Sequence, residues 1–233
     1  MYKFLADGAR FLLTAEDDQE LERGLVFGAW LYLFVTGIIT TFIPAPYGKF
    51  SENISNSLIG RLSSIKLQPA LAWSLQEVPS FLISLLATFH IGPTSGQGLL
   101  LLPFLLHYAN RSLLYPLLLS KGSKPVPLLT TAAAFLFCAY NGLLQSQAIA
   151  NLNFEALLPW TSCIGLIIFL LGMAINIHSD SVLRGLRKEG ETGYKIPHGG
   201  LFFLLSSPHY FGECIEWCGF AALTQVGKKG NFV

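Results

Sequence analysis

A single carboxyl group lies in the segment "LAWSLQEVPSF", which is otherwise rich in apolar residues. One face of a helix over this segment would carry Trp73, Gln76, Glu77 and Ser80, which recur at the spacing i, i+3, i+4 and i+7. Ionisable groups are costly inside a membrane and usually serve a binding site or a water-filled cavity. A carboxyl group there favours its neutral form, so Glu77 could donate a hydrogen bond to a ligand oxygen. Gln76 and Ser80 are equally consistent with polar contacts between helices.

A tyrosine and an arginine occur together in a second segment, "LLHYANRSLLYP". Tyr108 and Arg111 fall on one helical face, with Tyr115 a turn beyond. A tyrosine in a membrane helix is usually an interfacial anchor. An arginine near a helix end often extends to the aqueous edge of the membrane. Taken alone, this segment favours an anchor over a catalytic pair.

Two carboxyl groups and a histidine line one face of the segment "SSPHYFGECIEWCGF". Ser207 and Pro208 are typical of a helix start. His209, Glu213 and Glu216 then follow at i, i+4 and i+7. They could bind a metal or a cationic or hydroxylated ligand, and the helix N-terminus could receive an anion such as phosphate. Because charge inside a membrane is costly, a purely structural role for all three is the less favoured alternative.

A fourth polar segment, "GMAINIHSDSVLRGLRKEG", follows a long apolar run. We expect Asn176 to end the apolar helix, and Ser179 or Asp180 to cap a short helix after it. The segment is then either an ordinary helix end beside a basic loop or one wall of a cofactor pocket. In such a pocket Arg187 and its neighbours would meet phosphates, and Asn176 and Asp180 would hold amides or hydroxyls. The sequence has neither a glycine-rich dinucleotide fingerprint nor a P-loop, so a nucleotide would be held by another architecture.

Long uncharged stretches indicate which elements must position these residues. Of the 233 residues, 52% are hydrophobic and 12% are charged, whereas about a quarter of the residues in soluble domains are charged. We therefore predict an all-α, polytopic membrane helix bundle surrounded by lipid. The predicted spans are 24–44, 70–90, 98–119, 126–147, 157–177 and 200–223. The net charge of +1 gives no support for nucleic-acid binding.

All four cysteines, Cys138, Cys163, Cys214 and Cys218, fall within the predicted spans. Cys214 and Cys218 share a helix face, but two thiols alone are a weak indication of a zinc site. We therefore predict that the cysteines pack inside the membrane and form neither a disulfide framework nor a metal site.

Loop charges predict the orientation of the bundle. Lys and Arg occur in three predicted loops, 45–69, 120–125 and 178–199, and are absent from the opposite loops, 91–97 and 148–156. Cytoplasmic loops of membrane proteins carry an excess of positive charge. We therefore predict an N-terminus outside the cytosol and a cytosolic basic loop after the fifth span.

At its polar segments the chain resembles the steroid 5α-reductase family, the 3-oxo-5α-steroid 4-dehydrogenases. The matching stretches are "AWSLQEVPSF", "HYANRSLLYP", "GMAINIHSDSVLRGLRKEGETGYKIPHGGLFFLLS" and "PHYFGECIEWCGFA". The resemblance covers residues 24 to about 224. It implies a multi-pass enzyme of the endoplasmic reticulum with a seven-helix membrane fold. Such an enzyme reduces the Δ4 double bond of 3-oxosteroids with NADPH supplied from the cytosolic side.

The resemblance also implies roles for single residues. Glu77 and Tyr108 would be catalytic and contact the steroid's 3-oxo group, and the substrate-binding positions would be Trp73, Gln76 and Arg111. The cofactor-binding positions would be Asn176, Asp180, Arg187, Tyr194, His209 and Glu213, with His209 in place of an asparagine common in the family. Hydride would add at C5, and Tyr108 with protonated Glu77 would stabilise the enolate that forms at the 3-oxygen.

The chain departs from the family pattern after Thr224, where it continues as "QVGKKGNFV". We predict a membrane domain over residues 1–224 and a divergent tail over 225–233, where the family has a seventh helix and a basic segment. That segment adds cofactor contacts, so weak or absent NADPH binding is expected. The alternatives are a truncated, catalytically silent membrane isoform, a polyprenol or enoyl-CoA reductase, and an isoprenylcysteine methyltransferase-like enzyme.

Overall fold

A computed structural model describes residues 24, 26–32, 34–35, 37–38, 64–119, 123–186 and 195–225. Its main helices are α4 (Pro69–Ile91), α5 (Gly96–Ala109), α6 (Tyr115–Leu118), α7 (Leu128–Ala150), α8 (Pro159–Gly185) and α9 (Pro208–Thr224). A π-helical segment, Asn110–Leu114, joins α5 to α6, and 3-10 turns lie at Phe154–Ala156 and Gly200–Phe203. Two short strands, β1 (Lys66–Leu67) and β2 (Val126–Pro127), pair antiparallel.

The all-α membrane bundle predicted from the sequence is confirmed. By length and apolar composition, α4, α7 and α8 could each cross a membrane. The described part of the first predicted span, 24–44, is also helical. The last helix begins at Pro208 instead of residue 200, because residues 200–203 form a separate 3-10 turn. The short β1–β2 ladder was not predicted.

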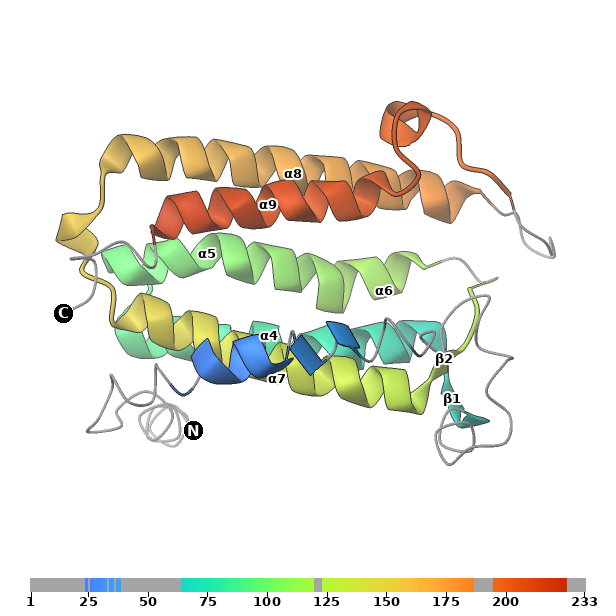
Figure 1. The fold of residues 1–233 in the computed structure, drawn as a ribbon, viewed down its shortest axis with the longest axis horizontal. Coiled ribbons are helices and arrows are strands. Elements are labelled where there is room, and N and C mark those ends of the chain that lie inside the picture. Colours follow the sequence, from blue (N-terminus) through green and yellow to red (C-terminus); the bar gives the residue numbers. More distant parts are fainter. Residues whose placement is uncertain are drawn as a thin grey trace.

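The helices form three layers (Figure 1). Helices α8 and α9 lie side by side in one layer, and α4 packs against α7 in the layer opposite. The chain from α5 through α6 runs between them, so its side chains can contact both layers. This central position places the segment of Tyr108 and Arg111 inside the bundle.

Glycines allow α8 and α9 to approach backbone to backbone. Gly165 and Gly172 on α8 face Gly219 and Gly212 on α9, and both pairs are spaced seven residues apart. A Cβ atom on Gly172 would overlap the backbone nitrogen of Glu216. In membranes, where lipid is as apolar as the side chains, such close backbone contact is a main source of helix association.

Small polar side chains and a glycine allow α4 and α7 to pack closely. The Ser80 hydroxyl donates a hydrogen bond of 2.6 Å to the Cys138 carbonyl, and Ser146 donates one of 3.2 Å to Ser84. A Cβ atom on Gly142 would lie 2.9 Å from the Ser80 Cα atom. Helix α4 continues through Pro79, and these contacts fix its register against α7.

The segments that flank the basic loops meet at one end of the bundle. The β1–β2 pairing joins the chain before α4 to the chain before α7. The C-terminal end of α8 and the 3-10 turn at Gly200–Phe203 lie at the same end in Figure 1. This arrangement agrees with the grouping of loops on which the predicted orientation depends; the orientation itself remains a prediction.

The predicted helix break in the fourth polar segment is wrong. Helix α8 runs without interruption to Gly185, so neither Ser179 nor Asp180 caps a new helix. The Ser179 hydroxyl donates back to the Ile175 carbonyl within α8 at 2.7 Å. The Asp180 carboxylate is paired with Arg111 across the bundle. Both side chains therefore have partners that leave the helical backbone intact.

Candidate active site

A buried arginine organises the first of two adjoining polar clusters. Arg111, in the π-helical segment, places Nη1 3.0 Å from Asp180 Oδ2 on α8. Its Nε lies 3.8 Å from Glu213 Oε1 on α9. The guanidinium also lies over the rings of Trp73 and Tyr115, with its carbon 4.9 and 4.6 Å from the ring centroids. We call Arg111, Asp180, Glu213, Asn176 and His209 the arginine cluster.

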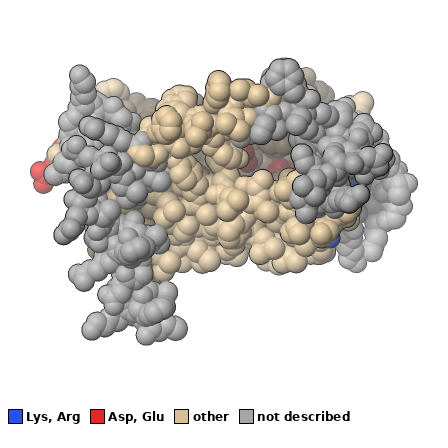
Figure 2. Space-filling view, turned by 60° about the horizontal axis from the view of Figure 1, so that its bottom comes forward, with Lys and Arg blue, Asp and Glu red and all other residues tan. Residues whose placement is uncertain are grey.

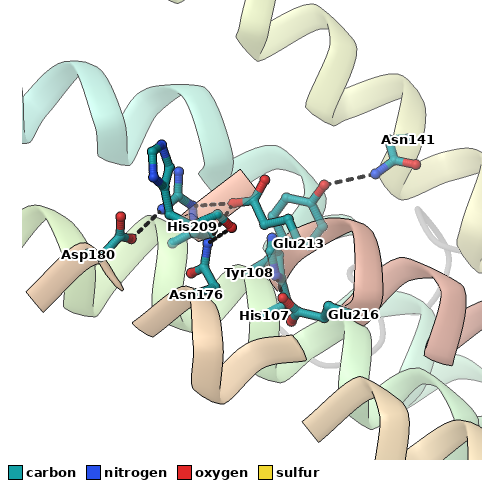
Figure 3. Close-up of polar contacts among 9 residues, drawn as sticks. His107, Tyr108, Asn141, Asn176, Asp180, His209, Glu213 and Glu216 are labelled. Atoms are coloured by element: carbon teal, nitrogen blue, oxygen red, sulfur yellow. Dashed lines mark hydrogen bonds and ion pairs between the residues drawn. The ribbon is translucent and has the colours of Figure 1, made fainter. Parts of the chain in front are cut away.

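Asn176 and His209 complete the arginine cluster (Figure 3). The Asn176 amide donates to the His209 carbonyl at 3.1 Å and to Glu213 Oε1 at 3.2 Å. The Nδ1 atom of His209 is buried and has no hydrogen-bond partner among the described residues. Buried polar atoms in proteins are nearly always hydrogen-bonded, so an unpartnered one within a polar cluster is a candidate ligand contact.

The second cluster lies around the Tyr108 hydroxyl, between α4, α5 and α7, and we call it the tyrosine cluster. The Asn141 amide of α7 donates to the Tyr108 oxygen at 2.8 Å (Figure 3). The Cys138 thiol, also on α7, lies 3.5 Å from Glu77 Oε2. Glu77 is close enough to act electrostatically on both Tyr108 and Arg111. Glu77 therefore links the two clusters into one polar region.

A buried acid–imidazole pair lies beside the tyrosine cluster. Glu216 is fully buried on α9, and its Oε1 is 2.9 Å from His107 Nδ1. Aromatic rings surround the pair: the Trp217 centroid is 4.6 Å from the His107 centroid, and Phe104, Phe169 and Phe220 pack around Trp217. The rings cross at steep angles, and Phe104, Phe169 and Phe220 belong to the hydrophobic core, with Trp217 packed against it.

One face of the bundle is hollowed (Figure 2). Figure 2 shows acidic atoms at the bottom of a hollow in an otherwise largely uncharged face. A separate pocket of about 380 Å³ lies at the end of the bundle where α8 terminates. Its lining includes Arg184, Lys195, Ser207, Tyr115 and His209. Tyr115 and His209 thus connect a cation-lined pocket to the arginine cluster.

The amino-acid sequence of the chain is similar to those of known proteins. The family profile for 3-oxo-5-alpha-steroid 4-dehydrogenase matches residues 124–231. The chain is 43% identical to bovine 3-oxo-5-alpha-steroid 4-dehydrogenase 1 over 222 residues, which cover 91% of this chain and 79% of the bovine protein. It is 39% identical to the cotton (Gossypium hirsutum) steroid 5-alpha-reductase DET2 over 221 residues, covering 89% and 81%. The chain belongs to the 3-oxo-5-alpha-steroid 4-dehydrogenase family.

A human member of this dehydrogenase family, 3-oxo-5-alpha-steroid 4-dehydrogenase 1, is 45% identical over 182 residues. That alignment covers 72% of this chain and 68% of the human protein. The mammalian and plant relatives thus match most of the chain. Family membership by itself assigns no role to a single side chain.

The structure brings most of the residues chosen from the sequence into this polar region. The residues found there are Glu77, Tyr108, Arg111, Asn176, Asp180, His209, Glu213 and Trp73. Gln76 is buried on α4, but within the described ranges no hydrogen bond joins it to either cluster. Arg187 and Tyr194 lie outside the described residues. The sequence analysis assigned no role to His107, Cys138 or Asn141 in the site.

Replacing Arg111 with methionine is expected to destabilise the bundle by about 3 kcal/mol, because removing one partner of a buried ion pair leaves the other charge uncompensated. Asp180 and Glu213 would lose their cation. Thermal unfolding in detergent, followed by circular dichroism, measures the loss. The double variant Arg111→Met/Asp180→Asn also removes one of the unpaired carboxylates and should recover part of the lost stability. A single variant as stable as the wild type would show that the ion pairs do not hold the helices together.

Proposed function

We propose that the protein reduces the Δ4 double bond of 3-oxosteroids with NADPH and forms 5α-reduced steroids. The observation that supports this best is the convergence of the buried Tyr108 and the half-buried Glu77 beside the arginine cluster. In this proposal Tyr108 and Glu77 hold the steroid's 3-oxygen. Trp217, which is half-buried beside His107, would pack against the apolar rings.

Tyr108 and Glu77 would act as the electrostatic part of the catalyst. Negative charge develops on the 3-oxygen when hydride adds to the conjugated enone at C5. Preorganised donors at such an oxygen stabilise the transition state more than the ground state, and each is typically worth about 10²–10³ in rate. Tyr108 donates its phenol proton, and the Glu77 carboxyl group provides the second contact to the 3-oxygen. Burial of Tyr108 at 4% exposure keeps competing water away from this contact.

The arginine cluster and the cation-lined pocket fit the two ends of a dinucleotide. Bound NADPH supplies the hydride. Arg184 and Lys195 offer positive charge for phosphate groups, which arginine binds with several donors at once. Asn176 and Glu213 offer an amide and a carboxylate for the carboxamide, and the unpartnered His209 Nδ1 offers a further contact. By the resemblance, Asp180 and the residues Arg187 and Tyr194 would complete this cofactor side.

A cytosolic cofactor pocket follows from the predicted orientation. We infer an endoplasmic-reticulum membrane location, with the N-terminus in the lumen and the basic end of the bundle in the cytosol. The pocket contains Arg184 and Lys195, which belong to the predicted cytosolic loop 178–199. NADPH would thus reach its site from the compartment that supplies it.

Arg184→Gln is expected to raise the KM for NADPH about tenfold and to change kcat little, since one charge-assisted hydrogen bond contributes about 1.5–3 kcal/mol. Steady-state kinetics at saturating steroid would measure both parameters. The matched control is Lys124→Gln, an exposed lysine at the same end and outside the residues that line the pocket. Equal increases in KM for both variants would argue against a phosphate site in this pocket.

The proposed function is tested in membranes that contain the 233-residue chain. A 3-oxo-Δ4-steroid and NADPH should yield a saturated 3-oxosteroid, detected by mass spectrometry, and membranes without the chain should yield none. Polyprenol and an enoyl-CoA are offered in parallel, and binding of S-adenosylmethionine is measured. Reduction of one of those lipids alone, or binding of S-adenosylmethionine without NADPH, would favour the corresponding alternative. Absence of any reduction would favour the catalytically silent isoform.

A further inference from the structure

The ring of Tyr108 is buried against aromatic neighbours, so the direction of its hydroxyl proton is a main remaining freedom. The ring packs against Phe104 and His107, with centroid distances of 4.7 and 4.9 Å. The Ser112 hydroxyl donates to the Tyr108 carbonyl at 2.6 Å within the same helical segment. A hydrogen bond from a neighbouring residue to the hydroxyl oxygen therefore decides the direction in which the hydroxyl proton points.

Asn141 occupies one side of that hydroxyl. Its Nδ2 donates to the Tyr108 oxygen at 2.8 Å, from α7 across to α5. A phenol has one proton to donate and lone pairs that accept. When an amide N–H fills an acceptor position, the phenol proton must point to a different acceptor. Asn141 thus holds Tyr108 as a donor directed away from α7.

We propose that Asn141 is a positioning residue: its amide donates to Tyr108 and so aims the phenol proton at the 3-oxygen of the substrate. This inference rests on the proposed function. The same hydrogen bond also stabilises partial negative charge on the phenol oxygen as it shares its proton with the developing enolate. Hydrogen bonds in such low-dielectric networks strengthen one another.

Helix α7 supports Glu77 in a similar way. Cys138 lies three residues before Asn141, on the same helical face, and its thiol is 3.5 Å from Glu77 Oε2. A thiol is a weak donor, so its effect is smaller than that of the amide. The bond from Ser80 to the Cys138 carbonyl, 2.6 Å, fixes this part of α7 against α4. One helix therefore places a donor beside each of the two proposed contacts to the 3-oxygen.

The test compares Asn141→Asp with Asn141→Leu. Aspartate has nearly the same shape but only accepts, so it would take the phenol proton away from the substrate. We expect kcat for steroid reduction to fall at least a hundredfold in Asn141→Asp and about tenfold in Asn141→Leu, with the KM for NADPH unchanged in both. The control is Asn151→Asp, the same replacement at the C-cap of α7, which should leave kcat unchanged. Wild-type kcat in Asn141→Asp would overturn the inference.

A spectroscopic measurement keeps the inference separate from the proposed function. Isotope-edited infrared spectra of ring-labelled tyrosine, with the Tyr108→Phe spectrum subtracted, report whether the phenol accepts or donates. The wild type is expected to accept from Asn141, and Asn141→Asp is expected to switch Tyr108 to donating toward α7. If the wild-type phenol already donates to Asn141, the inference is wrong whether or not the protein reduces steroids.

Discussion

Tyr108→Phe is expected to lower kcat for steroid reduction by about 10²–10³, because it removes a preorganised donor at the oxygen where charge develops. The change deletes one oxygen atom from a ring that stays packed against Phe104 and His107. Binding of the apolar steroid rings should change much less than kcat. Initial rates at saturating NADPH, over a range of steroid concentrations, separate the two effects.

Two comparisons make the Tyr108 result specific. Tyr32→Phe applies the same change to an exposed ring that stacks on Phe137, and it should leave kcat unchanged. Glu77→Gln keeps a donor at the neighbouring position and should lose less activity than Glu77→Ala. If Tyr108→Phe kept wild-type kcat, Tyr108 would be the interfacial or packing residue that its segment alone suggests.

Gly172→Ala is expected to destabilise the protein by roughly 3 kcal/mol, at the upper end of the usual cost of overpacking. The added methyl group would overlap the backbone of α9 at Glu216, which cannot move aside as a side-chain end can. Helices α8 and α9 would have to separate. Together they carry Asn176, Asp180 and Glu213, so the arginine cluster would be disrupted as well.

The glycine prediction has a matched control on the same helix. Gly185 faces open space, so Gly185→Ala should be neutral or slightly stabilising. Thermal unfolding in detergent and the monodisperse yield after size-exclusion chromatography measure both variants. Equal stability of Gly172→Ala and Gly185→Ala would show that α8 and α9 do not depend on close backbone contact.

The sequence correctly predicted the helices that are defined by a long run of apolar residues. Uncharged runs located α4, α7 and most of α8, and Ser207-Pro208 marked the observed start of α9. The extension of α8 to Gly185 was missed, because Ser179 and Asp180 resemble a helix cap when only local residues are considered. Ser179 instead bonds back to Ile175 within α8, and Asp180 pairs with Arg111 on another helix, a contact that is not visible in the local pattern.

Site residues that share one helix could be predicted from the sequence. Contacts between residues on different helices could not. Spacing and family resemblance selected Glu77, Tyr108 and Glu213. The partnership of Tyr108 with Asn141 joins residues 33 positions apart, and that of Arg111 with Asp180 joins residues 69 positions apart. No periodicity within a single helix contains such information. Cys138 was expected only to pack, and it does, but its thiol also faces Glu77.

The most direct test of the account follows the hydride itself. Membranes containing the 233-residue chain are supplied with a 3-oxo-Δ4-steroid and NADPH deuterated at both C4 positions of the nicotinamide ring. The product is analysed by mass spectrometry and deuterium NMR. We expect one deuterium at C5, on the α face, and a 3-oxo group that remains intact. Deuterium at C3, or a saturated product without deuterium, would contradict it.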